Sequence, residues 1–295
     1  MSTVLNPCAP ALTRRKFRLQ DFAEHKQKGE PIVMVTAYDS TSARLAELAG
    51  IEVILVGDSV AMVCLGHDTT LPVTLEQMLH HARAVARGAR TPFLIGDLPF
   101  LSYHGTPAEA VHNAGLFLKE AAMDAVKLEG GRERLPAVRA IIEAGIPVMG
   151  HLGLTPQKIR QLGGFKPQAR TAAAAQFLTE DALALQDAGV FSLVLESVPQ
   201  EVALHVSQEL EIPTIGIGAG PHCDGQVLVW HDLLGLDDTF VPPFAKTYRS
   251  VGKMIVEGLA DYRREVKDGL FPAAPQTRSM EPQELDEFQQ KVRAC

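Results

Sequence analysis

Val53-Ile54-Leu55-Val56 is a short, wholly apolar run that is followed at once by Gly57-Asp58, and Phe93-Leu94-Ile95 is followed in the same way by Gly96-Asp97. Runs this short and this apolar are typical of parallel strands that are covered on both faces. Six further runs have the same character: Ile32–Thr36, Ala125–Leu128, Val148–Met149, Ser192–Leu195, Thr214–Ile217 and Val227–Val229. The sequence therefore predicts eight strands.

Longer segments with helical signals separate these runs. Thr74 with Gln77, and Thr106 with Glu109, fit the capping box that begins a helix, and Pro107 suits the first helical position. Several glycines stand where a left-handed cap would end a helix: Gly50, Gly88, Gly145 and Gly189. Such alternation permits an open doubly wound sheet or a closed barrel. Eight units in roughly 200 residues, without a change in composition, favour a single (β/α)₈ TIM barrel in the α/β class.

We expect the barrel to span residues 26–268, with a peripheral lead-in at 1–25 and a peripheral tail at 269–295. Two connections are long, Val60–Leu71 after the second strand and Leu152–Arg170 after the fifth. Both follow the carboxyl ends of strands, where barrel active sites are built. They are either lids over a site or plain surface insertions.

The composition excludes several classes of function. The net charge of −7 gives no electrostatic reason to bind nucleic acid or an anionic membrane. No apolar run approaches the roughly 18 residues of a membrane-spanning helix, so we expect no membrane partner. The cysteines are scattered, which suits reduced thiols in the cytoplasm: Cys8, Cys64, Cys223 and Cys295. The basic group Arg14–Arg18 is interpreted as a solvated lead-in, with an organelle transit peptide as the alternative.

Acidic residues follow the second, third, fourth and sixth runs, as Asp58, Asp97, Glu129 and Glu196. Consecutive strands of a barrel are neighbours, so the first three carboxylates should converge at its mouth. Carboxylates repel one another unless a cation lies among them, and oxygen ligands without clustered His or Cys favour Mg²⁺. For any one of these residues a helix cap or loop hydrogen bond is the alternative.

Other polar residues fall in the same region. Lys127 and Glu129 are two positions apart, so strand alternation points both side chains the same way. Facing inward, Lys127 suits a substrate carboxylate, and a structural ion pair is the alternative. Ser59 could bind a substrate carboxylate or cap a turn. We expect His151 to follow the fifth strand through Gly150. It is either catalytic or a hydrogen-bonded structural residue.

Two segments partly match motifs of other functions. Gly216–Gly220 is not the GxGxxG of a dinucleotide site, so close backbone approach to a ligand or turn chemistry fits it better. The segment Gly57-Asp58-Ser59-Val60-Ala61 lacks the last glycine of the GxSxG that serine hydrolases carry. A hydrolase would also leave Asp58 without a role.

Taken together, these motifs resemble the ketopantoate hydroxymethyltransferase family, in order over about residues 30–245. The octapeptide Gly150–Gln157 (GHLGLTPQ) is the most specific match. The remaining matches are Val35–Asp39, Val56–Ser59, Gly66–Asp68, Leu71–Thr74, Asp97–Phe100, Lys127–Gly131, Leu195-Glu196, Gly216–Gly220 and Asp224–Gln226. The segment Ser102–Thr106 departs from the pattern, since His104-Gly105 makes it one residue longer.

The resemblance implies a barrel enzyme of pantothenate biosynthesis that converts 3-methyl-2-oxobutanoate to 2-dehydropantoate. It implies Mg²⁺ as cofactor and 5,10-methylenetetrahydrofolate as the one-carbon co-substrate. The implied roles are metal binding for Asp58, Asp97 and Glu129; substrate binding for Asp58, Ser59, Asp97, Lys127 and His151; and proton acceptance for Glu196.

The family also implies a homo-oligomer, a decamer, working in the cytoplasm. Three alternatives stay open from sequence: another Mg²⁺-dependent barrel carboligase or lyase of 2-oxo acids, a serine hydrolase, and a barrel that only binds a ligand. Turnover of the 2-oxo acid with methylenetetrahydrofolate would distinguish the implied activity from each of these alternatives.

Overall fold

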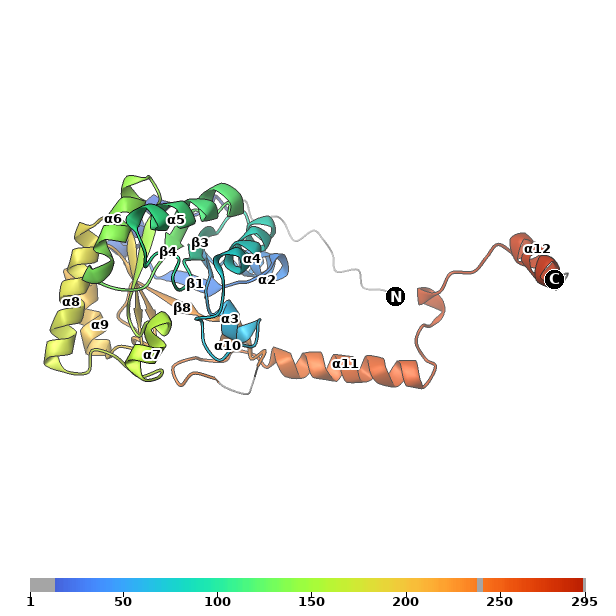
Figure 1. Cartoon of the computed structure of the whole chain (residues 1–295). Coiled ribbons are helices and arrows are strands. Elements are labelled where there is room, and N and C mark those ends of the chain that lie inside the picture. The colour runs from blue at the N-terminus through green and yellow to red at the C-terminus, as the bar shows by residue number, and fades with distance from the viewer. Residues whose placement is uncertain (1–13, 238–240, 294–295) are drawn as a thin grey trace.

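The computed structural model describes residues 14–237 and 241–293. Eight parallel strands follow one another around a closed barrel, and the eighth pairs with the first (Figure 1). The predicted single (β/α)₈ barrel is confirmed. The strands are β1 (Ile32–Thr36), β2 (Val53–Val56), β3 (Phe93–Asp97), β4 (Ala125–Lys127), β5 (Val148–Gly153), β6 (Ser192–Glu196), β7 (Thr214–Ile217) and β8 (Gly225–Leu228).

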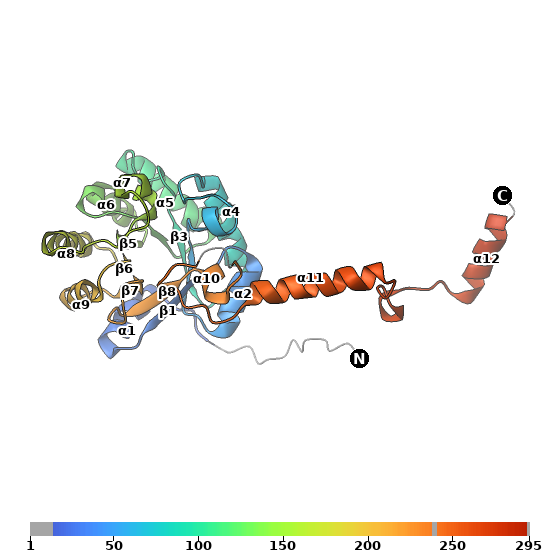
Figure 2. The ribbon, with the colours of Figure 1, turned by 90° about the horizontal axis from the view of Figure 1, so that it is seen from below.

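Helices surround most of the barrel, and three short ones lie at its carboxyl end, which Figure 2 views. The α-helices are α1 (Leu19–Lys28), α2 (Ser40–Ala49), α3 (Val60–Val63), α4 (Leu75–Gly88), α5 (Pro107–Ala121), α6 (Leu135–Glu143), α7 (Ile159–Leu162), α8 (Ala172–Asp187), α9 (Gln200–Glu209), α10 (Trp230–Leu234), α11 (Val251–Lys267) and α12 (Pro282–Arg293). Short 3₁₀ turns occur at Arg132–Arg134, Pro156–Lys158 and Ala274–Gln276. Within the described ranges, no helix combines the length and the apolarity that crossing a membrane requires.

Five strands differ from the expected bounds. β4 ends one residue earlier, at Lys127, and β6 ends one residue later, so that Glu196 lies within the strand. β3 and β5 run two and four residues further, so that Asp97 and His151 lie inside strands rather than after them. His151 is paired with Val194 of β6, which corrects its predicted place. β8 begins at Gly225 instead of Val227, because Gly225 and Gln226 pair with β7 and β1. Apolar character alone does not reveal a strand end that is glycine-rich or polar.

The local signals for helices are largely confirmed. The capping boxes of Thr74 and Thr106 are both present. Gly50, Gly145 and Gly189 adopt the predicted left-handed conformation. The prediction for Gly88 is wrong, since Gly88 is the last residue of α4 and the cap is an extended alanine. A Cβ at Gly88 would lie 2.2 Å from the backbone oxygen of Ser40, so this glycine permits α2 and α4 to pack closely.

Aromatic rings fill the amino end of the barrel. Phe22 of α1 packs edge-on against Phe93, with ring centroids 5.2 Å apart, and against Phe191, at 4.9 Å. Phe93 begins β3 and Phe191 immediately precedes β6, so α1 closes this end. The polar chemistry is thereby confined to the opposite end. Helix α1 spans the predicted boundary between lead-in and barrel at residue 25, and the division itself stays a prediction.

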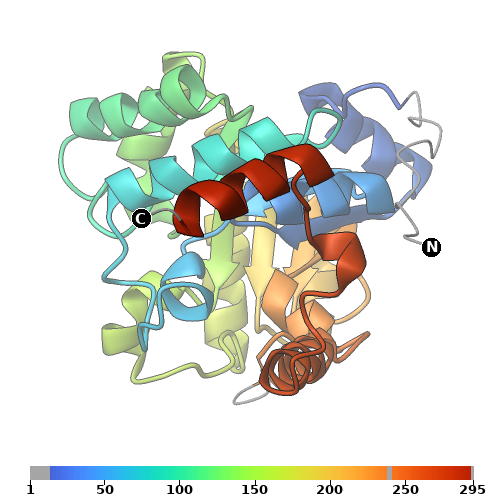
Figure 3. The same ribbon diagram turned by 90° about the vertical axis from the view of Figure 1, so that its right-hand side faces the viewer.

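Helix α11 projects away from the barrel, and α12 lies beyond it (Figures 1 and 2). Figure 3 views α11 end-on, below the helices that cover the barrel. Its apolar side chains are exposed, among them Ile255 at 48% and Leu259 at 62%. An amphipathic helix normally buries its apolar stripe.

Candidate active site

A set of charged side chains is buried at the carboxyl ends of β2 to β5. Asp58 stands two residues after β2, Asp97 and Lys127 end β3 and β4, and Glu129 follows β4. These four residues, and His151 of β5, are each no more than 4% exposed. The structure therefore brings together the acids that the sequence predicted to converge. Burying this much charge requires compensation by pairing or by a cation.

Strand register places the first charged pair. Asp97 and Lys127 are direct neighbours across β3 and β4, and the Lys127 Nζ lies 3.0 Å from the Asp97 Oδ1. The backbone N–H of Asp58 donates to the Asp97 Oδ2 at 3.2 Å. Asp97 thus links β2 to β4. The structural ion pair that was predicted as one of two roles for Lys127 is therefore present.

His151 connects this group to Glu196. Its Nδ1 lies 3.3 Å from the Lys127 Nζ and 3.5 Å from the Glu129 Oε1. Its Nε2 lies 3.2 Å from a carboxylate oxygen of Glu196, which ends β6. Lys127 and Glu129 both reach the same imidazole, which confirms their common direction. Burial and Lys127 push the pKa of His151 down, but contacts with Glu129 and Glu196 outweigh them and raise it to about 9.

Gln157 joins two of the carboxylates. Its backbone N–H donates to the Glu129 Oε2 at 3.0 Å. Its side-chain amide donates to the Asp58 Oδ2 at 3.0 Å and to the Leu98 carbonyl at 3.0 Å. Both amide hydrogens are used, so the amide end of this side chain faces the carboxylates. Gln157 is 4% exposed, and no role is predicted for it from the sequence beyond its place in the octapeptide.

Tyr103 fixes the orientation of that amide. Its hydroxyl donates to the Gln157 Oε1 at 2.7 Å and lies 3.2 Å from the backbone N–H of Glu129, from which it can accept. Burial, followed by the charge of Glu129, raises the pKa of Tyr103 well above its ordinary value, so the hydroxyl stays a donor. A closed set of hydrogen bonds thus runs through Glu129, Tyr103 and Gln157. A Tyr on a rim loop carries no sequence signal for this function.

Ser59 lies beside this group and is half-buried. Its hydroxyl lies 2.8 Å from the Tyr38 hydroxyl, and either oxygen can be the donor. Ser59 precedes α3, but its side chain makes no capping hydrogen bond, which was the alternative role. In the described chain its partner is a tyrosine and not a histidine, so the proton relay of a serine hydrolase is missing.

The electrostatics favour an added cation. Burial, then repulsion from Asp97 and Glu129, raises the pKa of Asp58 well above its usual range. Burial also raises the pKa of Asp97 despite the neighbouring Lys127. Contacts with His151 and Lys127 instead lower the pKa of Glu129 against the effect of its burial. Among the described residues, Lys127 and His151 are the cationic groups that contact these carboxyl groups, which number four with Glu196. Full ionisation would therefore leave two negative charges in excess.

The donor set suits a hard divalent cation, because it consists of carboxylate oxygens. The Glu129 Oε1 makes no hydrogen bond among the described residues, although it is buried. In the described chain, however, no three His, Cys, Asp or Glu side chains already converge around one point closely enough to hold an ion. The residues that could hold such a cation are Asp58, Asp97 and Glu129, and Asp58 would first have to leave the Gln157 amide.

The glycine-rich turn after β7 belongs to the framework of the fold. Gly218 and Gly220 have φ values of 62° and 81°. A Cβ at Gly218 would lie 2.8 Å from the Phe244 ring, and one at Gly220 would lie 2.5 Å from Gln200. Left-handed backbone and close packing against the chain itself account for these glycines, which favours the turn interpretation of Gly216–Gly220.

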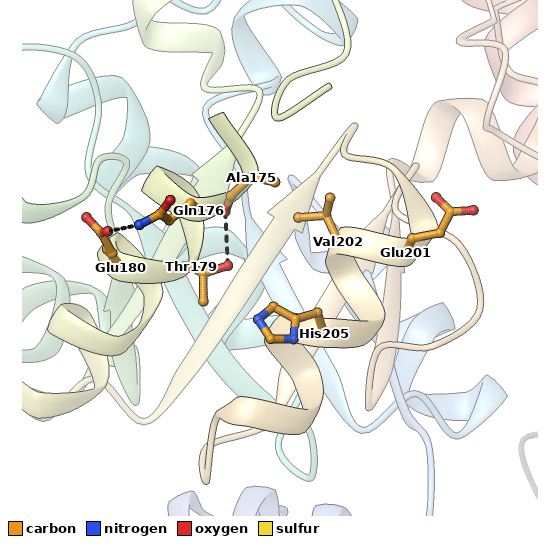
Figure 4. Close-up of a pocket in the computed structure, with 7 residues that line it drawn as sticks. All are labelled: Ala175, Gln176, Thr179, Glu180, Glu201, Val202 and His205. Carbon is orange, nitrogen blue, oxygen red and sulfur yellow. Dashed lines mark hydrogen bonds between the residues drawn. The ribbon is translucent and has the colours of Figure 1, made fainter. Parts of the chain in front are cut away.

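A groove lies on the outer surface between α8 and α9 (Figure 4). The side chains that line it are Ala175, Gln176, Thr179, Glu180, Glu201, Val202 and His205. Its two drawn hydrogen bonds, Gln176 to Glu180 and Thr179 to the Ala175 carbonyl, both lie within α8. None of the predicted site residues lines this groove, so the barrel mouth remains the candidate active site.

Solved structures share the fold at low sequence identity. A phosphonopyruvate hydrolase is 14% identical, with a TM-score of 0.59 over 94% of this chain and 96% of the other. A 2,3-dimethylmalate lyase is 17% identical, with a TM-score of 0.55 over 94% of this chain and 99% of the other. These likenesses show the fold alone.

Closer relatives show the family. The 3-methyl-2-oxobutanoate hydroxymethyltransferase of Syntrophobacter fumaroxidans is 59% identical over 238 residues, 81% of this chain and 84% of the relative. The protein of that name from Heliobacterium modesticaldum is 52% identical over 267 residues, 90% of this chain and 97% of the relative. A family model described as ketopantoate hydroxymethyltransferase matches residues 16–274. The chain is therefore an enzyme that belongs to the ketopantoate hydroxymethyltransferase family.

Proposed function

We propose that this enzyme performs the Mg²⁺-dependent hydroxymethylation of 3-methyl-2-oxobutanoate to 2-dehydropantoate, with 5,10-methylenetetrahydrofolate as the one-carbon donor, in pantothenate biosynthesis. The observation that carries the proposal is the buried group of Asp58, Asp97, Glu129 and Lys127, joined to Glu196 through His151, in a chain of this family. This group combines an oxygen-donor set, a cation for a carboxylate, and a carboxylate that can accept a proton.

Binding of the 2-oxo acid is assigned to Lys127, Ser59 and the metal site. The Lys127 ammonium can bind the substrate carboxylate while keeping its contact with Asp97. The Ser59 hydroxyl, oriented by Tyr38, can donate to the same carboxylate. When bound there, Mg²⁺ would act as a Lewis acid on the keto oxygen. This effect is worth several kcal/mol of charge stabilisation. A phosphonopyruvate hydrolase of this fold has been solved with oxalate and Mg²⁺, so the fold can accommodate such a pair.

Proton removal from C3 is assigned to Glu196. Its side chain is 14% exposed, in contrast to the almost fully enclosed carboxylates of the metal site, so it can face a bound substrate. Protonated His151 would orient it from below through the contact at 3.2 Å. A positioned carboxylate base contributes typically 10²–10⁴-fold.

The full reaction then balances as follows. The C3–H bond breaks and its proton passes to Glu196, and the C3 carbanion of the enolate forms a bond to the methylene carbon of the folate. The bonds from that carbon to the folate nitrogens break, and water supplies the hydroxyl group. The two nitrogens take up the remaining proton of that water and the proton held by Glu196, which restores the carboxylate. The products are 2-dehydropantoate and tetrahydrofolate, with no oxidation or reduction overall.

The direct test is product formation by the purified protein. Incubated with Mg²⁺, 3-methyl-2-oxobutanoate and methylenetetrahydrofolate, it should form 2-dehydropantoate, detected by NMR, and chelation of the metal should stop the reaction. Omission of folate distinguishes the second candidate, another Mg²⁺-dependent carboligase or lyase of 2-oxo acids. The name of the dimethylmalate lyase favours that candidate, which predicts cleavage products without any one-carbon donor.

Assembly as a homo-oligomer in the cytoplasm completes the proposal. Val33 of β1 is 46% exposed and Leu48 of α2 is 59% exposed, so apolar surface near β1 is left uncovered in the single chain. The free apolar stripe of α11 is of the kind that would cover such a surface on a second copy. Light scattering should show an oligomer whose mass falls in Ile255→Asp and is unchanged in the charge variant Lys253→Gln. A monomeric native protein would refute this part.

A further inference from the structure

The connection between β5 and α8 is strongly basic. We name residues Thr155–Arg170 the β5 loop. The loop contains no acidic residue, in a chain whose net charge is −7. Its four basic residues are Lys158, Arg160, Lys166 and Arg170. Lys158 pairs with Glu133. The other three are exposed and, within the described ranges, make no ion pair.

Both ends of the β5 loop are tied to the active site. Near its beginning, Gln157 bonds to Glu129 and Asp58 of the metal site. Near its end, the backbone N–H of Gln168 donates to the carbonyl of Ser197 at 2.9 Å, and Ser197 directly follows Glu196. The intervening residues, with α7, therefore lie beside the barrel mouth, on the side that carries both the metal ligands and the assigned base (Figure 2).

The same loop exposes an aromatic ring. Phe165 is 49% exposed and stands between Gly164 and Lys166. Gly163 and Gly164 both have positive φ values, 68° and 119°, so a bulky residue in their place would be strained. Acidic residues occur in other segments that follow strands, with Asp39 after β1, Asp68 after β2 and Asp232 in α10.

We infer that the β5 loop binds the folate co-substrate, with Arg160, Lys166 and Arg170 contacting the carboxylates of its glutamate tail and Phe165 packing against its aminobenzoyl ring. The inference rests on the proposed function. A folate combines an aromatic body with a chain of carboxylates, and this loop offers the complementary pair of groups beside the residues to which oxo-acid binding is assigned. Exposed cations would attract a longer, more negative polyglutamate tail more strongly, and the attraction would weaken with salt.

The test uses a charge-removing triple variant, Arg160→Gln, Lys166→Gln and Arg170→Gln, in the full chain. Its matched control is Arg87→Gln, Lys119→Gln and Arg139→Gln, which removes the same charge from exposed positions on α4, α5 and α6. Calorimetry with tetrahydrofolate carrying one or five glutamates measures the affinity directly. Exposed ion pairs are individually weak, so we expect the three together to account for roughly a tenfold loss for the pentaglutamate, with a smaller loss for the monoglutamate.

Two further arms separate a specific site from a general anion surface. Phe165→Ala should weaken both folates by roughly two- to tenfold, as loss of an aromatic contact does. A pentaglutamate peptide without the pterin should bind much more weakly than the folate. The inference is overturned if the triple variant binds pentaglutamyl folate like the control variant, or if the bare peptide binds as tightly as the folate.

Hydrogen exchange without folate distinguishes a wrong assignment of the β5 loop from a wrong proposed function. Exchange of the C3 hydrogen of 3-methyl-2-oxobutanoate in D₂O needs no folate, so the triple variant should exchange at the native rate. A native protein that makes 2-dehydropantoate, while the triple variant keeps full affinity for the folate, would contradict only the assignment of the β5 loop.

Discussion

Replacing Tyr103 with Phe tests how the metal site is positioned. The change removes one oxygen and keeps the ring in place. It leaves the Gln157 Oε1 without its 2.7 Å donor and the Glu129 N–H without its acceptor, both in a buried setting. Each buried polar group without a partner costs about 1–3 kcal/mol, so the two together should lower the free energy of unfolding by about 2–6 kcal/mol.

The same change should weaken metal binding. Without the Tyr103 hydroxyl, the Gln157 amide and the Glu129 backbone, which hold the carboxylates of Asp58 and Glu129 in place, lose the partner that joins them. Loss of such an outer partner typically costs 10–100-fold in metal affinity. We therefore expect a Mg²⁺ dissociation constant raised by about that factor, measured by calorimetry, and a kcat that recovers at saturating Mg²⁺.

A suitable control is Tyr248→Phe, which removes a hydroxyl from a residue that is 53% exposed. It should change neither the unfolding free energy nor the affinity for Mg²⁺. If Tyr103→Phe loses stability but binds Mg²⁺ within twofold of the native protein, Tyr103 is a packing residue and the argument about the amide is wrong.

Three further predictions concern Asp97, Ser59 and His151 of the candidate active site. Asp97→Ala should weaken Mg²⁺ and Mg²⁺-dependent oxo-acid binding together, and unchanged affinities in calorimetry would exclude Asp97 from the metal site. Ser59→Ala should raise KM and keep a measurable kcat, as expected when a binding contact is lost; a trapped acyl-serine on the native enzyme would instead support a hydrolase. The raised pKa of His151, about 9, means that its contribution to stability is present below about 6.5 and lost as the pH rises through 9. Urea unfolding in EDTA should therefore show stability falling between these pH values, on the order of 3 kcal/mol, and His151→Asn should flatten the curve; stability that rises with pH would contradict it.

The barrel could be predicted because its strands are buried on both faces. Val53–Val56 is apolar at each position, and the strand has no exposed face to blur the pattern. The errors lie at strand ends. The sequence predicts that β5 ends before Gly150 and His151, because neither residue is apolar, but the ladder with β6 continues through both. Pairing between strands, which decides such ends, is not visible along one chain.

The candidate site was predictable only where strand order dictates proximity. Asp58 follows β2 and Asp97 ends the neighbouring β3, so their meeting follows from the order of strands in the barrel. Tyr103 and Gln157 come from loops whose paths the strand order does not determine. Tyr103 also stands in the segment that departs from the family pattern, so neither spacing nor resemblance pointed to it. Its role emerges from hydrogen bonds between segments 54 residues apart.

Glu196 is assigned to remove the C3 proton of the 2-oxo acid, and hydrogen exchange tests this assignment most directly. With Mg²⁺ and 3-methyl-2-oxobutanoate in D₂O, and no folate present, the native enzyme should exchange the C3 hydrogen at a rate followed by NMR. Glu196→Gln keeps the shape of the side chain but cannot accept the proton. It should bind Mg²⁺ and the oxo acid nearly normally and exchange about 10²–10⁴-fold more slowly, whereas the control Glu201→Gln, in the first turn of α9, should exchange like the native enzyme. Exchange by Glu196→Gln at the native rate would show that the proton leaves by another route and would contradict the mechanism.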